Sequence, residues 1–120
     1  MSLKANGTTA LPEVTTTDAE TVNWVVASQP ALSRNYAVGI TLHPVNTSGT
    51  ATVTAMPQGS VDETEWFDLE TSAATVNNAG TVANTSFEYA DAYYQYYRVK
   101  LVSTGTGVTT HNGEITLKSK

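Results

Sequence analysis

Apolar and polar residues alternate along much of this chain, most clearly in the segment 93–103, YYQYYRVKLVS. Successive side chains of an extended strand point to opposite faces. Aromatic and β-branched residues suit such a pleated, half-buried surface. The segment is therefore predicted to be the central strand of an all-β domain. Its expected inward face carries Tyr93, Gln95, Tyr97, Val99 and Leu101, and its outward face carries Tyr94, Tyr96, Arg98, Lys100 and Val102.

Shorter runs of the same kind predict about eight strands in all, because turn signals separate them at short and even spacing. Pro30, Pro44 and Pro57 are expected to end or break strands. No stretch shows the 3.6-residue period of a helix. We therefore expect an antiparallel β-sandwich, jelly-roll or immunoglobulin-like in strand order. The other expected strands span 21–27, 35–42, 50–56, 75–76, 81–82, 85–89 and 108–118, with hairpin turns at 46–49 and 104–107 and a bulge or turn at Asn112–Gly113.

The first 17 residues are predicted to form an extended arm, and residues 18–120 a single sandwich domain. Asn6-Gly7 is a turn signal, Pro12 disfavours a helix, and residues 15–17 are threonines. Such an arm would be a frayed terminus or would gain order on a neighbouring subunit. The candidate partner contacts in it are Leu3, Leu11, Pro12 and Val14.

The charge balance excludes some partners. The net charge is −5 with only six scattered Lys and Arg residues, so nucleic-acid binding is not expected. There is no apolar run long enough to span a bilayer and no secretory-signal pattern at the N-terminus, so no membrane partner is expected. The sequence contains no cysteine, which rules out disulfides and thiolate metal sites.

Few residues suggest chemistry, and we expect no catalytic, cofactor-binding or metal site. His43 and His111 have no neighbouring His or Cys, so each is expected to be a solvent-exposed residue at a strand end. The acidic cluster at 62–70 lacks calcium-loop spacing and is expected to be solvated acidity. A small hydrolase that uses a pair of these carboxylates is the weakest alternative.

The aromatic residues are the better candidates for function. Trp66, Tyr94 and Tyr96 are predicted to lie in an interface or to form a stacking surface. Tyrosine and tryptophan anchor protein interfaces and also stack on sugar rings. Burial against protein, within or between subunits, is favoured over sugar binding.

Residues 60–118 resemble small β-sandwich structural proteins of tailed bacteriophage virions. The resemblance rests on Ser60, Asp62, Trp66 and Leu69 in SVDETEWFDLE, on the aromatic strand and glycine turn from 93 to 107, and on the closing GEITLKSK. Glu63 stands where those proteins usually have glycine. No catalytic residue comes with the resemblance.

The resemblance implies a non-enzymatic virion protein, which would be a head decoration (cement) protein, a head fibre base or a tail-associated module. Of these we expect a capsid decoration protein that binds the outer shell and stabilises capsomer contacts. The cysteine-free chain without a signal pattern fits assembly in the host cytoplasm before the protein joins the virion. Its partners would be the major capsid protein or another virion protein and further copies of itself, with a trimer favoured. The alternative is a carbohydrate- or receptor-binding module of a phage tail or head fibre.

Overall fold

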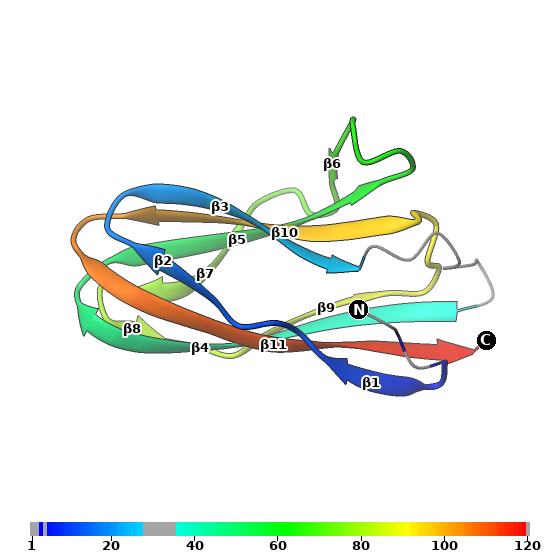
Figure 1. Cartoon of the computed structure of the whole chain (residues 1–120), viewed down its shortest axis with the longest axis horizontal. Helices are drawn as coiled ribbons and strands as arrows, with labels where there is room; N and C mark the ends of the chain where they lie inside the picture. The colour runs from blue at the N-terminus through cyan, green and yellow to red at the C-terminus, as the bar shows by residue number, and fades with distance from the viewer. Residues whose placement is uncertain (1–2, 4, 28–35, 120) are drawn as a thin grey trace.

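The computed structural model describes residues 3, 5–27 and 36–119, and these form two packed antiparallel sheets (Figure 1). This confirms the predicted sandwich. No described residue lies in a helix, so none belongs to a helix that could cross a membrane. Sheet A contains β1 (Gly7–Ala10), β2 (Val14–Thr17), β4 (Tyr36–Gly49), β9 (Thr85–Tyr89) and β11 (Gly107–Ser119). Sheet B contains β3 (Glu20–Ala27), β5 (Thr52–Ser60), β6 (Phe67–Asp68), β7 (Ala74–Asn78), β8 (Thr81–Val82) and β10 (Tyr96–Thr104).

The strand order is that of a jelly roll. Sheet A runs β1-β11-β4-β9, with β2 also paired to β11, and sheet B runs β3-β10-β5-β7. If β1 and β2 are taken as one interrupted strand and the short β6 and β8 are set aside, eight strands remain. When these eight strands are numbered along the chain, their order is 1-8-3-6 in sheet A and 2-7-4-5 in sheet B. This order is that of two interlocked Greek keys. Successive strands therefore alternate between the sheets along much of the chain.

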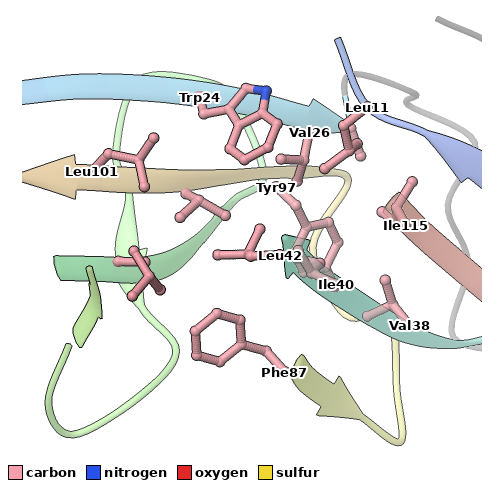
Figure 2. Close-up of a cluster of buried hydrophobic side chains, with 14 of the residues drawn as sticks. Leu11, Trp24, Val26, Val38, Ile40, Leu42, Phe87, Tyr97, Leu101 and Ile115 are labelled. Atoms are coloured by element: carbon pink, nitrogen blue, oxygen red, sulfur yellow. The ribbon is translucent and has the colours of Figure 1, made fainter. Parts of the chain in front are cut away.

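The core lies between the sheets and is built by the predicted alternation (Figure 2). In β10, Tyr97, Val99 and Leu101 are fully buried, whereas Lys100 is exposed. This strand pairs with β3 on one side and β5 on the other, so its predicted central position is confirmed. It begins at Tyr96 rather than Tyr93. The opposite layer contributes Val38, Ile40, Leu42, Phe87 and Ile115.

Two prolines that were expected to end strands lie inside them. β4 continues through Pro44, and β5 continues through Pro57. Proline is tolerated where its missing N–H has no partner strand to bond. The pairing of β9 with β4 stops at Leu42, and the stretch of β5 at Pro57 falls between its pairings with β6 and β7. Pro30 lies outside the described residues.

Both predicted hairpin turns are instead connections between sheets. β4 leads into β5, and β10 into β11, but each of these pairs is divided between sheets A and B. The turn after β4 falls at 50–51 rather than 46–49. Gly105 has the positive φ expected of a turn glycine, 87°. Asn112 and Gly113 pair regularly with β4, and the irregularity in β11 lies at Val108/Thr109.

The segment expected as a free arm lies in sheet A. β1 pairs with the C-terminal half of β11, and β2 pairs with its N-terminal half. Leu11, between them, is only 8% exposed and belongs to the core, and its N–H donates to the Gly113 carbonyl at 2.9 Å. The described part of this segment is extended as predicted, but it is an edge of the sandwich.

Candidate functional site

The loop between β5 and β6 is shaped by two short side chains. Ser60 Oγ accepts the N–H groups of Asp62 (3.2 Å) and Glu63 (2.9 Å). Asp62 Oδ1 accepts those of Thr64 (2.9 Å) and Glu65 (3.0 Å) and the Ser60 hydroxyl (3.1 Å). Such side-chain-to-backbone bonds replace the ladder bonds that the loop lacks. The Glu65 and Thr64 N–H groups hold the pKa of Asp62 below its usual value.

Trp66 and Arg98 are held against each other at the outer face of sheet B. The Arg98 guanidinium lies 4.2 Å from the centre of the Trp66 ring, and Trp66 Nε1 donates to the Glu63 carbonyl at 3.2 Å. Arg98 Nε donates to Gln58 Oε1 at 2.8 Å, and Gln58 Nε2 donates to Asp68 Oδ1 at 2.8 Å. Partial burial lowers the pKa of Arg98, which still carries its charge near neutral pH.

Three aromatic side chains gather beside this loop, and we call Phe67, Tyr93 and Tyr94 the aromatic end cluster. The Tyr94 ring stacks on Phe67 with centroids 6.2 Å apart and meets Tyr93 edge-on at 5.0 Å. It also meets the buried ring of Tyr97 edge-on at 6.2 Å, which ties the cluster to the core. Phe67 is 49% exposed and Tyr93 is 56% exposed.

Gly59 makes room for Tyr94. A Cβ at Gly59 would lie 2.3 Å from a carbon of the Tyr94 ring, closer than real Cβ atoms come. The backbone N–H of Tyr94 donates to the Tyr97 hydroxyl at 3.3 Å, and burial raises the pKa of Tyr97. The cluster is therefore a fixed surface rather than a set of loose side chains.

The three predicted aromatic residues lie in different surroundings. Tyr94 stacks on Phe67 of β6, Trp66 directly precedes β6 and contacts Arg98, and Tyr96 is half-buried beside Ser60 of β5. Tyr94 precedes β10, so it does not share the outward face of Tyr96 as the strand pattern predicted. Tyr93, predicted to face the core, is exposed for the same reason. The Asp91-to-Gln95 stretch gives no sequence signal that the strand begins only at Tyr96.

The predicted arm contacts pack on the chain's own core. Leu11 is part of the core, and Leu3 and Val14 are half-buried against it. Pro12 is exposed, but its carbonyl accepts the Trp24 Nε1–H at 2.9 Å. Their proposed role in binding a partner stays a prediction, although most of this apolar surface is already covered within the chain.

The two histidines differ from each other. His43 lies on the outer face of sheet A, 3.3 Å from Glu114. The expectation of a solvent-exposed residue is wrong for His111, which is 2% exposed, bonds Thr16 Oγ1 through Nε2 at 3.0 Å and packs near Trp24. Burial lowers its pKa to about 4. Among the described residues, no three His, Asp or Glu side chains converge as metal ligands would.

A shallow groove of about 450 Å³ runs along β4 on the outer face of sheet A. Ala37 and Gly39 form its floor, and Glu88 of β9 and Lys118 of β11 lie on its two sides. The face around it is rich in hydroxyl groups that bond one another, as Thr8 does with Thr116 at 2.9 Å. Among the described residues that line it, Tyr89 is the one aromatic side chain, and the charged side chains of Glu88 and Lys118 are exposed.

Comparison with known proteins places the chain by fold alone. No protein-family model and no curated protein sequence matches it. The Yersinia pseudotuberculosis-derived mitogen is similar in structure, with a TM-score of 0.59 and 11% identity over 92% of this chain and 86% of that one. A chain in the structure of infectious bursal disease virus, Gt strain, is similar over 92% of this chain and 31% of its own, with a TM-score of 0.51 and 11% identity. This chain therefore spans about a third of that viral chain.

Proposed function

We propose that this chain is a non-enzymatic structural protein of a virion, a decoration protein that binds the outer shell and stabilises capsomer contacts. It is assembled in the host cytoplasm and becomes part of the virion. Its partner is the major capsid protein or another virion protein, and it works as a homo-oligomer. The aromatic end cluster is the surface that meets the shell.

The observation that carries the proposal is the exposure of aromatic rings that are already fixed in place. Phe67 and Tyr93 are each about half exposed, yet both pack on Tyr94, which is anchored at Gly59 and Tyr97. Protein interfaces are enriched in Tyr, Phe, Trp and Arg, and these residues dominate binding energy. Because the rings are fixed before binding, little side-chain entropy would be lost on contact.

Two further observations support a virion role. The segment 60–118 resembles phage virion proteins, and the aromatic end cluster is built from that segment. The jelly-roll order of the strands is also a fold found in viral capsids.

The test is binding of purified chain to shells of the phage that encodes it, measured by co-sedimentation. The double variant Phe67→Ser and Tyr93→Ser removes the exposed part of the aromatic end cluster and should weaken binding at least about tenfold, about 1.4 kcal/mol. Val45→Ser removes an equally exposed apolar side chain on the outer face of sheet A and is the matched control. Equal binding by the double variant and the control would rule out this surface.

A carbohydrate- or receptor-binding module of a tail or head fibre is the second candidate. The stacked pair Phe67 and Tyr94, with an interplanar angle of 23°, offers a flat aromatic face of the kind that sugar rings stack on. Titration with host polysaccharide while Trp66 fluorescence is followed separates the candidates, because Trp66 lies beside Phe67 in the chain. A saturable change that Phe67→Ser abolishes would favour the sugar-binding module.

A further inference from the structure

We propose that the outer face of sheet B is a docking surface for the acidic loop of a second copy of this chain. The basic face is defined by Arg98 and Lys100, and the acidic loop by Asp62, Glu63, Thr64 and Glu65. The inference deepens the homo-oligomer part of the proposed function, and it can be tested without the shell because it concerns self-association in solution.

Arg98 lies in a row of paired residues that crosses four strands of sheet B and ends at Asp68. Arg98 of β10 pairs with Val25 of β3 on one side and Gln58 of β5 on the other, and Gln58 pairs with Asp68 of β6. Lys100 follows two residues later on the same face of β10 and is exposed. Val25 is 49% exposed, so the row offers apolar surface beside the two cations.

Arg98 is positioned before any partner arrives. Its guanidinium is stacked on Trp66, and its Nε–H is engaged by Gln58, which Asp68 anchors in turn. Within the described residues, no carboxylate forms an ion pair with Arg98 or Lys100. The four Nη hydrogens of a guanidinium held in this way suit a two-pronged bond to a carboxylate.

The acidic loop is an equally fixed group of opposite charge. Bonds from Thr64 N–H and Glu65 N–H to Asp62 hold its backbone, and the Glu63 and Glu65 side chains are exposed. Trp66 bonds the Glu63 carbonyl through its indole N–H, and its ring is covered by Arg98. Trp66 therefore contacts both the loop backbone and Arg98, and among the described residues Glu63 and Glu65 form no ion pair with the basic face of their own chain.

Charge complementarity favours a second copy as the occupant, because one molecule carries both the acidic loop and the basic face of the exposed Lys100 and the half-buried Arg98. A loop of one copy on the face of the next is a head-to-tail contact. Repeated contacts of this kind close into a ring when the rotation between copies permits and otherwise extend as a chain. A trimer is one such ring.

The test mixes two charge-reversed variants and measures mass by light scattering and sedimentation velocity at low salt. One variant carries Arg98→Glu with Lys100→Glu, and the other carries Glu63→Lys with Glu65→Lys. Each alone brings like charges together and should associate at least tenfold more weakly than the original chain. Their equimolar mixture should associate again, because the lysine loop meets the glutamate face and the original loop meets the original face.

Two charge reversals on sheet A serve as controls. Lys118→Glu and Glu88→Lys reverse charges on the outer face of sheet A and should leave association unchanged. Circular dichroism checks that each variant folds. If the variant with Arg98→Glu and Lys100→Glu does not fold, a variant with Arg98→Gln and Lys100→Gln takes its place. The proposal is overturned if the original chain stays monomeric up to about 1 mM, a very weak affinity. It is also overturned if the mixture fails to associate, or if the loop variant associates normally by itself.

Discussion

The buried imidazole of His111 links the stability of this fold to acidity. The ring is enclosed with Trp24 and Thr16, and its burial lowers its pKa to about 4, whereas the unfolded value is about 6.5. Between these two values the unfolded chain binds the proton and the folded chain does not. The stabilisation is therefore complete above about pH 6.5 and is lost as pH falls toward 4.

The expected loss from this one group is about 3–4 kcal/mol in the free energy of unfolding, because its pKa falls from about 6.5 to about 4 at 1.36 kcal/mol for each pKa unit. Urea denaturation at a series of pH values measures it. His111→Gln should flatten the slope between pH 6.5 and 4, although it also lowers the stability at every pH. His43→Gln, at the surface of sheet A, should retain the slope, and a slope that persists in His111→Gln would assign it to other groups.

Two glycines in neighbouring layers, Gly59 and Gly39, differ in the space that an added side chain would find. The Cβ of Gly59→Ala would collide with the Tyr94 ring at 2.3 Å, whereas that of Gly39→Ala has its nearest neighbour, the Phe87 carbonyl oxygen, at 3.9 Å. Gly59→Ala should cost about 1–3 kcal/mol and displace Tyr94. Gly39→Ala should change the free energy of unfolding by less than about 0.5 kcal/mol. Similar denaturation midpoints for the two variants would contradict the close packing at Gly59.

At the scale of elements, β1 and β2 form one edge of sheet A. Their pairing with β11 is expected to stabilise that strand. Leu11→Ala removes a core side chain between these strands and should cost about 2–4 kcal/mol. Deletion of residues 1–17 should remove the cooperative unfolding transition, because both strands paired with β11 on this side are lost. Thr15→Ala, an exposed position on β2, is the control. A truncated chain that unfolds as sharply as the full chain would show that these strands are dispensable.

The sequence predicted the strands in which apolar side chains alternate toward the core. It did not predict features that depend on which other strands lie beside a given strand. Tyr97, Val99 and Leu101 are inward as expected, because period-two alternation is a local property of the strand. The prediction that Pro44 and Pro57 end strands is wrong, because a strand tolerates proline where β6, β7 or β9 no longer pairs with it. β1 and β2 were not predicted as strands, because a polar edge strand has the composition of a free arm and its pairing with β11 is not visible in the sequence.

The candidate site was predictable in its residue types and not in its arrangement. Trp66 and Tyr94 could be chosen because large aromatic side chains are effective in interfaces. The stacking of Tyr94 on Phe67 depends on the space left at Gly59, and the position of Trp66 depends on the turn at Ser60 and Asp62. The buried state of His111 was also missed, since its environment comes from β2 and β3, distant in sequence.

At the scale of the whole molecule, one polar side chain joins the two sheets. Asn77 of β7, in sheet B, is fully buried and donates through Nδ2 to Asn46 Oδ1 of β4 (3.1 Å) and Thr109 Oγ1 of β11 (2.8 Å), both in sheet A. Its Oδ1 accepts the N–H of Gly80 at 3.0 Å. Buried polar groups that are fully bonded in this way specify one arrangement of the elements that they join.

Asn77→Ala should therefore cost about 2–4 kcal/mol, because the buried Thr109 hydroxyl and the Gly80 N–H lose their partner. Thr47→Ala removes an exposed hydroxyl pair between Thr47 and Thr110 within sheet A and should cost less than about 0.5 kcal/mol. Chemical denaturation gives both values, and amide hydrogen exchange in β7 and β8 shows whether the sheets separate locally there. Faster exchange in β7 and β8 with β10 unchanged is the expected pattern. A uniform increase across both sheets would mean that Asn77 stabilises the fold as a whole without holding this end of the sandwich closed.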